Sequence, residues 1–241
     1  MTNRPKVRLF VPHHFSDEVP VELSQAQSHY LTAVMRLGIG ARIEVFNGQD
    51  AAWLAEILEP HRKKTVILPK EISTPFYPLA DLWLLFAPIK KARTDFIIEK
   101  ATELGVSRIQ PVFTDYTNSE RLRLDRLRAH AIEAAEQCGG TAVPDIVEPQ
   151  KLSHVLDSMD KKRHLFFCDE QRAGDPLATL PAGPAAILVG PEGGFSLGER
   201  QALAARSNVR PLHLGSRILR ADTAVVAAIT RWMVDAGPWT K

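Results

Sequence analysis

Leu188-Val-Gly-Pro-Glu-Gly-Gly-Phe-Ser196 and Leu214-Gly-Ser-Arg-Ile-Leu-Arg-Ala-Asp-Thr-Ala224 are the two stretches that decide the fold of this chain. In each, a short apolar run meets glycine and is followed by a stretch with helical character. This order is typical of parallel strands whose following loops present backbone N–H and C=O groups at the carboxyl edge of the sheet. Two such loops predict a ligand site at that edge.

Outward from these stretches, residues 79–241 alternate between apolar runs and helical periodicity. The pattern predicts strands at 82–87, 108–113, 164–168, 186–190 and 212–215, and helices at 93–104, 120–138, 197–206 and 223–234. Ser196 and Glu199 have the spacing of a capping box at the start of a helix. These features predict an α/β domain with a largely parallel sheet.

The first 72 residues have a different pattern, with short alternating runs that indicate strands and one helix at 24–35. Asn47-Gly48 between two of the runs is a strong hairpin signal. We therefore predict a small β-barrel at 1–72. Two prolines within residues 73–78 favour a linker, which places the second domain at 79–241.

Composition narrows the class of protein. The formal net charge of the 241-residue chain is only +2, so any contact with nucleic acid must come from local patches. Cys138 and Cys168 have no zinc-site or disulfide spacing, and we expect both to be buried and reduced. The eight histidines show no metal-binding spacing, and no long apolar segment is present. We expect a soluble cytoplasmic protein that needs neither a metal nor a membrane.

Gly190-Pro-Glu-Gly-Gly194 together with Leu214-Gly-Ser-Arg-Ile-Leu-Arg220 resembles the RsmE family of SPOUT methyltransferases. The resemblance extends upstream to the motifs at 100–106, 133–137 and 29–37. It implies that the barrel is a PUA-like RNA-binding domain and that the α/β domain is a SPOUT domain with a C-terminal trefoil knot. It also implies a homodimer with the active site near the subunit interface.

The resemblance further implies an activity, S-adenosylmethionine-dependent methylation of N3 of uridine 1498 in 16S rRNA of the small ribosomal subunit. The cofactor would be held by backbone groups of the two glycine loops, with Ile218 and Leu219 as walls for its adenine. The cofactor-binding residues predicted in this way are Leu188, Val189, Gly190, Pro191, Glu192, Gly193, Gly194, Leu214, Gly215, Ile218 and Leu219.

Methylation at N3 requires loss of the imide proton, because the neutral nitrogen has no free lone pair. A fixed guanidinium favours the resulting anion, and Arg220 is the first candidate. In the alternative interpretation, Arg220 forms an ion pair with Asp222 or Glu192 and has only the structural role of bracing the loop. Glu192 and Asp222 are candidate proton acceptors. The family commonly has glutamate at the position of Asp222, so bracing or helix N-capping is the alternative for this shorter side chain.

Basic residues provide candidates for contact with RNA phosphates. The candidates are Arg8, His13 and Arg36 in the barrel and Lys90, Lys91 and Arg93 after the first strand of the α/β domain. The alternative for each is a solvated surface charge.

Three other functions fit parts of the pattern. The chain could methylate another rRNA or tRNA nucleotide, or it could be a non-catalytic RNA-binding protein of ribosome assembly. Intact glycines in both loops argue against the second. A Rossmann-type methyltransferase is a weaker alternative, because Ala87-Pro-Ile-Lys90 stands where a glycine-rich turn is required.

Overall fold

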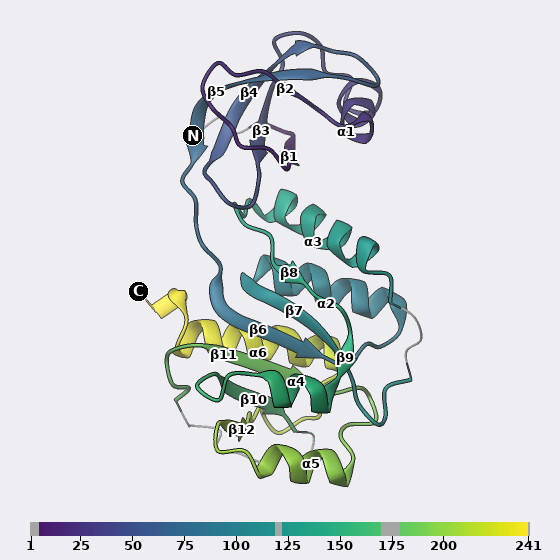
Figure 1. Ribbon diagram of the computed structural model, residues 1–241, viewed down its shortest axis with the longest axis vertical. Coiled ribbons are helices and arrows are strands. Elements are labelled where there is room, and N and C mark those ends of the chain that lie inside the picture. The colour runs from purple at the N-terminus through teal and green to yellow at the C-terminus, as the bar shows by residue number, and fades with distance from the viewer. Residues whose placement is uncertain (1–4, 119–121, 170–178, 241) are drawn as a thin grey trace. The chain divides into compact units, whose positions relative to one another are not determined.

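The computed structural model describes residues 5–118, 122–169 and 179–240 (Figure 1). The chain forms two compact units, one of residues 1–78 with 135–143 and the other of residues 79–134 with 144–241. Within the described residues, no helix combines the length and the apolar character needed to cross a membrane.

The N-terminal unit is built on a curled five-stranded sheet (Figure 1). Its strands are β1 (Arg8–Phe10), β2 (Val21–Glu22), β3 (Arg42–Phe46), β4 (Ala52–Glu59) and β5 (Val66–Thr74). The order is β1-β3-β4-β5-β2, with β1 parallel to β3 and the other pairs antiparallel. The strand pairings among the described residues leave β1 and β2 at the two edges. The predicted barrel is therefore an open, curled sheet.

Local sequence explains the turns of this unit. Asn47-Gly48 joins β3 to β4 as predicted, with Gly48 at φ +81° and Asn47 Oδ1 accepting the Gln49 and Asp50 N–H groups. Ser24 and Gln27 form a capping box at the start of α1 (Gln25–His29). The helix predicted at 24–35 continues as a π-helical turn, η1 (Tyr30–Val34).

A buried ion pair joins the first and third strands. The Arg8 Nε donates to Glu44, and the two side chains are only 11% and 3% exposed. Ser73 Oγ also donates to Glu44 Oε1 at 2.6 Å. Burial raises the pKa of Glu44, but the hydrogen bonds from Ser73 and Arg8 and the Arg8 charge outweigh it and hold the pKa below its usual 4.5. This carboxylate stays ionised inside the unit.

The same arginine explains why residues 135–143 belong to the N-terminal unit. Its two terminal nitrogens donate to the Ala135 and Gly140 carbonyls, each at 2.7 Å. Glu136 Oε1 accepts the Phe10 N–H at 2.9 Å.

The linker predicted at 73–78 begins later than expected. Ser73 and Thr74 are the last residues of β5, and the hydroxyl groups of both donate hydrogen bonds to Glu44.

The second unit contains a seven-stranded sheet in which every described pairing is parallel, as predicted. The order is β12-β10-β11-β6-β7-β8, and β9 also pairs with β7. The strands are β6 (Ala80–Phe86), β7 (Val106–Phe113), β8 (Asp145–Ile146), β9 (Gln150–Lys151), β10 (His164–Cys168), β11 (Ala185–Val189) and β12 (Val209–Pro211). The helices are α2 (Lys91–Glu103), α3 (Leu124–Cys138), α4 (Leu152–Ser158), α5 (Leu197–Ala204), α6 (Ala221–Asp235) and the 3₁₀ turn η2 (Pro238–Thr240).

The central strands are apolar because both faces of the sheet are covered. Every residue of β11 is buried. Leu188 of β11 packs with Leu165 and Phe167 of β10 in a cluster that also takes Leu156 of α4 and Leu203 of α5. Helix α6 packs against β11 and α2. These contacts fix the positions of the loops that follow β10 and β11.

One strand prediction is wrong in position. A strand was expected at 212–215, but the strand in this region, β12, spans Val209–Pro211. Residues 212–215 belong to the loop that follows it. Leu212 N–H still donates to the Phe167 carbonyl at 2.8 Å, but the chain then turns away through Gly215 at φ +101°. The apolar residues of this stretch face a pocket, which periodicity cannot distinguish from the interior of a sheet.

Replacing Glu44 by glutamine should destabilise the N-terminal unit strongly. The change leaves the Arg8 charge buried without its partner, and breaking such a pair costs about 3–5 kcal/mol. Urea unfolding followed by tryptophan fluorescence measures this change. Glu71→Gln is the matched control, since Glu71 pairs with Arg42 in an exposed bridge worth less than about 1 kcal/mol. Equal losses in the two variants would contradict the buried role of Glu44.

The Glu44 contribution should depend on pH in a defined direction. Because the folded-state pKa lies below 4.5, the stabilisation is complete above pH 4.5 and is lost as pH falls through the folded-state pKa. The difference between wild type and Glu44→Gln should shrink over that acidic range.

The two cysteines should differ in reactivity. Cys138 is exposed, which corrects the expectation that both are buried. Burial raises the pKa of the Cys168 thiol to about 12, and the thiolate is the reactive form. At pH 8, iodoacetamide should modify Cys138 long before Cys168, as measured by peptide mass spectrometry. Equal rates in the native protein would contradict this, and the urea-unfolded chain is the control.

Candidate active site

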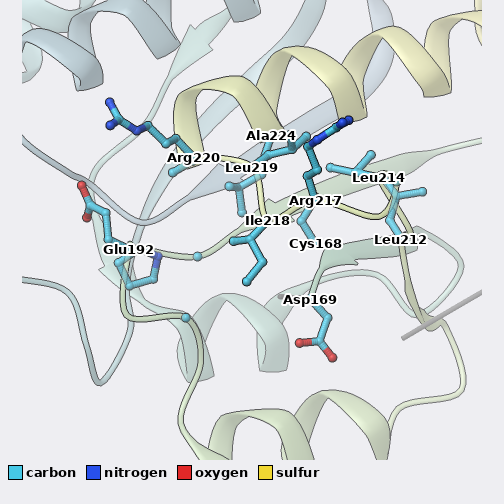
Figure 2. Close-up of a pocket in the computed structure, with 16 residues that line it drawn as sticks. Cys168, Asp169, Glu192, Leu212, Leu214, Arg217, Ile218, Leu219, Arg220 and Ala224 are labelled. Atoms are coloured by element: carbon cyan, nitrogen blue, oxygen red, sulfur yellow. The ribbon is translucent and has the colours of Figure 1, made fainter. Parts of the chain in front are cut away.

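A pocket of about 320 Å³ lies where β10 and β11 end and where the chain runs from β12 into α6 (Figure 2). A cavity of this size suits a small molecule. Its lining residues are Cys168, Asp169, Val189, Gly190, Pro191, Glu192, Gly194, Leu212, Leu214, Gly215, Arg217, Ile218, Leu219, Arg220, Ala221 and Ala224. Both glycine loops therefore meet at one site, as the sequence predicts.

The loop after β11 is a tight turn. Gly194 N–H donates to the Pro191 carbonyl at 2.9 Å, and Gly194 has φ +69°, a conformation that favours glycine. Gly190 is required for a different reason, since a Cβ there would lie 3.0 Å from the Phe195 ring. The turn thus brings backbone groups directly to the pocket wall.

Two predicted cofactor residues do not line this pocket. Leu188 is fully buried in the core of the sheet. Gly193 faces Tyr116, and a Cβ at this position would lie 3.2 Å from the Tyr116 Cβ. Leu188 supports the strand and Gly193 lets Tyr116 pack against the loop, and a backbone contact of either residue with the cofactor stays a prediction.

The second loop contributes apolar walls. Ile218 and Leu219 lie in the pocket, and Ile218 is 68% exposed although it is a large apolar residue. Arg231 of α6 holds the start of this loop, donating to the His213 carbonyl at 2.7 Å. Exposed apolar side chains on a fixed loop are suited to covering the flat face of a ligand.

The capping box predicted at Ser196 and Glu199 is confirmed. Ser196 Oγ accepts the Glu199 N–H at 3.2 Å, and Glu199 Oε2 accepts the Ser196 N–H at 2.9 Å. The other oxygen of Glu199 accepts the Asp115 N–H at 2.9 Å. This carboxylate therefore ties the loop after β7 to the start of α5 and steadies the end of the pocket loop.

Four charged side chains gather at the rim of the pocket. Arg93, in the first turn of α2, lies between Glu192 and Asp222, with Nη1 4.0 Å from Glu192 Oε1 and Nε 3.8 Å from Asp222 Oδ2. Arg220 has no side-chain hydrogen bond or ion pair with any described residue. Figure 2 shows its guanidinium and the Glu192 carboxylate on the same side of the pocket, with the Arg217 guanidinium pointing elsewhere. The alternative ion pair of Arg220 with either carboxylate is not formed.

Asp222 does not cap α6, because Arg220 occupies the N-cap position. Asp222 lies in the first turn, where its Oδ1 accepts the Thr223 N–H at 2.9 Å. A negative charge there is favoured by the helix dipole. Its contact with Arg93 agrees with the bracing role that the sequence left open.

The sequence reasoning missed six lining residues, which are Cys168, Asp169, Leu212, Arg217, Ala221 and Ala224. Cys168 is the last residue of a strand that the sequence predicted correctly, and Asp169 follows it. The rule that ligands bind beyond the carboxyl ends of parallel strands could have found them. Asp169 is held by an ion pair with Arg200. Residues 87–90, the position a Rossmann site would use, do not line the pocket.

The residues predicted to contact RNA differ in their exposure to solvent. Arg8 is corrected, because its guanidinium is nearly buried and all its donors face internal partners. His13, Arg36, Lys90 and Lys91 are exposed, and their contact with RNA stays a prediction. Across the described ranges, no cluster of three His, Cys, Asp or Glu side chains could hold a metal ion.

Comparison with known proteins agrees with this architecture. The family model for the RNA methyltransferase domain matches residues 77–233, and that for the RNA methyltransferase PUA domain matches residues 23–68. Two ribosomal RNA small subunit methyltransferases E are each 30% identical to this chain. The one from Rickettsia conorii aligns over 93% of both chains, and the one from Synechocystis sp. over 93% of this chain and 76% of its own.

A solved structure has the same fold. The ribosomal RNA small subunit methyltransferase E of Neisseria gonorrhoeae, bound to S-adenosyl methionine, superposes with a TM-score of 0.86. It is 27% identical, and the match covers 95% of this chain and 97% of that one. With matching domains over most of its length, the chain belongs to the ribosomal RNA small subunit methyltransferase E (RsmE) family.

Proposed function

We propose that this protein transfers a methyl group from S-adenosylmethionine to N3 of uridine 1498 in 16S rRNA. The observation that carries the proposal is the pocket at the sheet edge, where two glycine loops meet beneath a charged rim. The related enzyme from Neisseria gonorrhoeae, whose structure contains S-adenosyl methionine, supports the choice of cofactor.

The pocket residues fit this cofactor chemically. Leu212, Leu214, Ile218 and Leu219 offer an apolar slot for a purine ring. The glycine loops offer backbone N–H and C=O groups for the polar edges. Asp169, which follows β10 and pairs with Arg200, is a carboxylate of the lining whose oxygens can accept hydrogen bonds from hydroxyl or ammonium groups.

S-adenosylmethionine supplies an electrophilic methyl group on a sulfonium sulfur. In the reaction the sulfur–carbon bond breaks, a bond from N3 to that carbon forms, and the N3 proton leaves to water or a carboxylate. Arg220 stabilises the negative charge that spreads over the uracil ring once the proton is lost. Glu192, which lines the pocket whereas Asp222 does not, is the first candidate for receiving the proton.

The rest of the assignment follows from family membership. The N-terminal unit would bind 16S rRNA within the small ribosomal subunit, with His13, Arg36, Lys90 and Lys91 as phosphate contacts. We also expect a cytoplasmic homodimer and a C-terminal chain threaded as a trefoil knot. The loop from 212 to 220, which leads into helix α6, is the segment that such threading would involve.

The direct test is nucleoside mass spectrometry after incubating the protein with labelled S-adenosylmethionine and small ribosomal subunits that lack the modification. We expect labelled 3-methyluridine at a single position. Label on another nucleotide or on tRNA would change the target while keeping the enzyme class. Absence of label with every RNA would favour a non-catalytic role in ribosome assembly.

Arg220→Ala should slow methyl transfer by about 10²–10³-fold, the usual effect of removing one donor that stabilises an oxyanion. Cofactor affinity by calorimetry and the melting temperature should stay near wild type, because Arg220 has no described side-chain partner to lose. Arg210→Ala is the control, since Arg210 is an exposed arginine of β12 outside the pocket. Normal turnover by Arg220→Ala would remove Arg220 from the mechanism.

A further inference from the structure

The rim of the pocket holds its two carboxylates through one arginine. Arg93 comes from α2, Glu192 from the loop after β11, and Asp222 from the first turn of α6. The Arg93 side chain is 34% exposed, and its guanidinium approaches both carboxylates at 3.8–4.0 Å. These separations exceed hydrogen-bond length, so the contacts are electrostatic.

Among the described residues, Arg220 is a cation next to Asp222 that this arrangement leaves unpaired. Its side chain is exposed at the same rim and has no hydrogen bond or ion pair with the residues that the structure describes. It also stands at the N-cap of α6, where the helix dipole adds partial positive charge. A substrate that becomes negative at this rim would meet a free cation.

We propose that Arg93 is a positioning residue that occupies Glu192 and Asp222 and so keeps the Arg220 charge available to the substrate anion. The inference rests on the proposed function, in which the uridine must ionise before it is methylated. Two unbalanced carboxylates near the uracil would oppose that ionisation, because like charges raise the pKa of an acid. The positive charge of Arg93, a residue of α2, offsets these two negative charges.

Within the part of the chain that the structure describes, few charged residues surround Arg93. Lys90 and Lys91 lie at the start of its own helix, Glu192 faces it from the loop, and Arg220 and Asp222 belong to the start of α6. Asp95, further along α2, is paired with Arg126 of α3. A change of rate with pH after replacing Arg93 can therefore be assigned to this small group.

The test is the pH dependence of methyl transfer at saturating RNA and cofactor. Arg93→Ala should lower the rate at pH 7 about tenfold and move the rising limb of the profile up by about one pH unit. Arg93→Lys keeps the charge and should recover most of the rate. Cofactor affinity by calorimetry should change little in either variant.

A second replacement should rescue the first. Adding Asp222→Asn to Arg93→Ala removes the carboxylate closer to Arg93, so the profile should return toward wild type. Lys91→Ala is the matched control, because it removes an exposed cation from the same helical turn. It should raise the KM for RNA in a salt-dependent way without shifting the profile.

Three results would overturn the proposal. The first is an unshifted profile for Arg93→Ala, and the second is a shift that Asp222→Asn does not reverse. The third is loss of cofactor binding in both Arg93→Ala and Arg93→Lys, which would make Arg93 a structural brace. If wild type itself methylates no RNA, the proposed function fails instead, which the parallel wild-type assay shows directly.

Discussion

The parallel alignment of β10, β11 and β12 is the constraint on which the site depends. Parallel neighbours end at the same edge of a sheet, so the loops that follow them must gather there. β11 is buried along its whole length, and its core contacts to α4 and α5 fix where its loop begins. A cofactor pocket built mainly from backbone and apolar side chains needs this rigidity, because it has few charged groups with which to hold a ligand.

The order of the strands also decides which charges meet. β11 lies between β10 and β6, so the loop after β11 reaches toward α2, the helix that follows β6. α6 packs on both β11 and α2 and brings its first turn to the same place. Arg93, Glu192 and Asp222 are distant in sequence, yet this layering makes them neighbours.

Sequence reasoning succeeded where the signal was local. β10, the capping box of α5 and the two pocket loops each carry their evidence within a few residues. It failed where the partner was distant. Arg8 was predicted to bind RNA, but its partners at 44, 135 and 140 cannot be found by periodicity. For the same reason, the contact between Arg93 and the two carboxylates could not be predicted. The two-residue strands β8 and β9 are too short to produce a pattern.

For contact with RNA, the local charge at the pocket rim matters more than the net charge of the chain. A net charge of +2 gives little long-range attraction for RNA. Near the rim, however, Lys90 and Lys91 are exposed at the start of α2, Arg93 lies between Glu192 and Asp222, and Arg220 has no ion pair with a described residue. This local excess of positive charge suits both a phosphate backbone and a uracil that has lost its proton. Binding and ionisation of the substrate would then draw on the same small set of side chains, and the two can be separated only by measuring rate against pH as well as against salt.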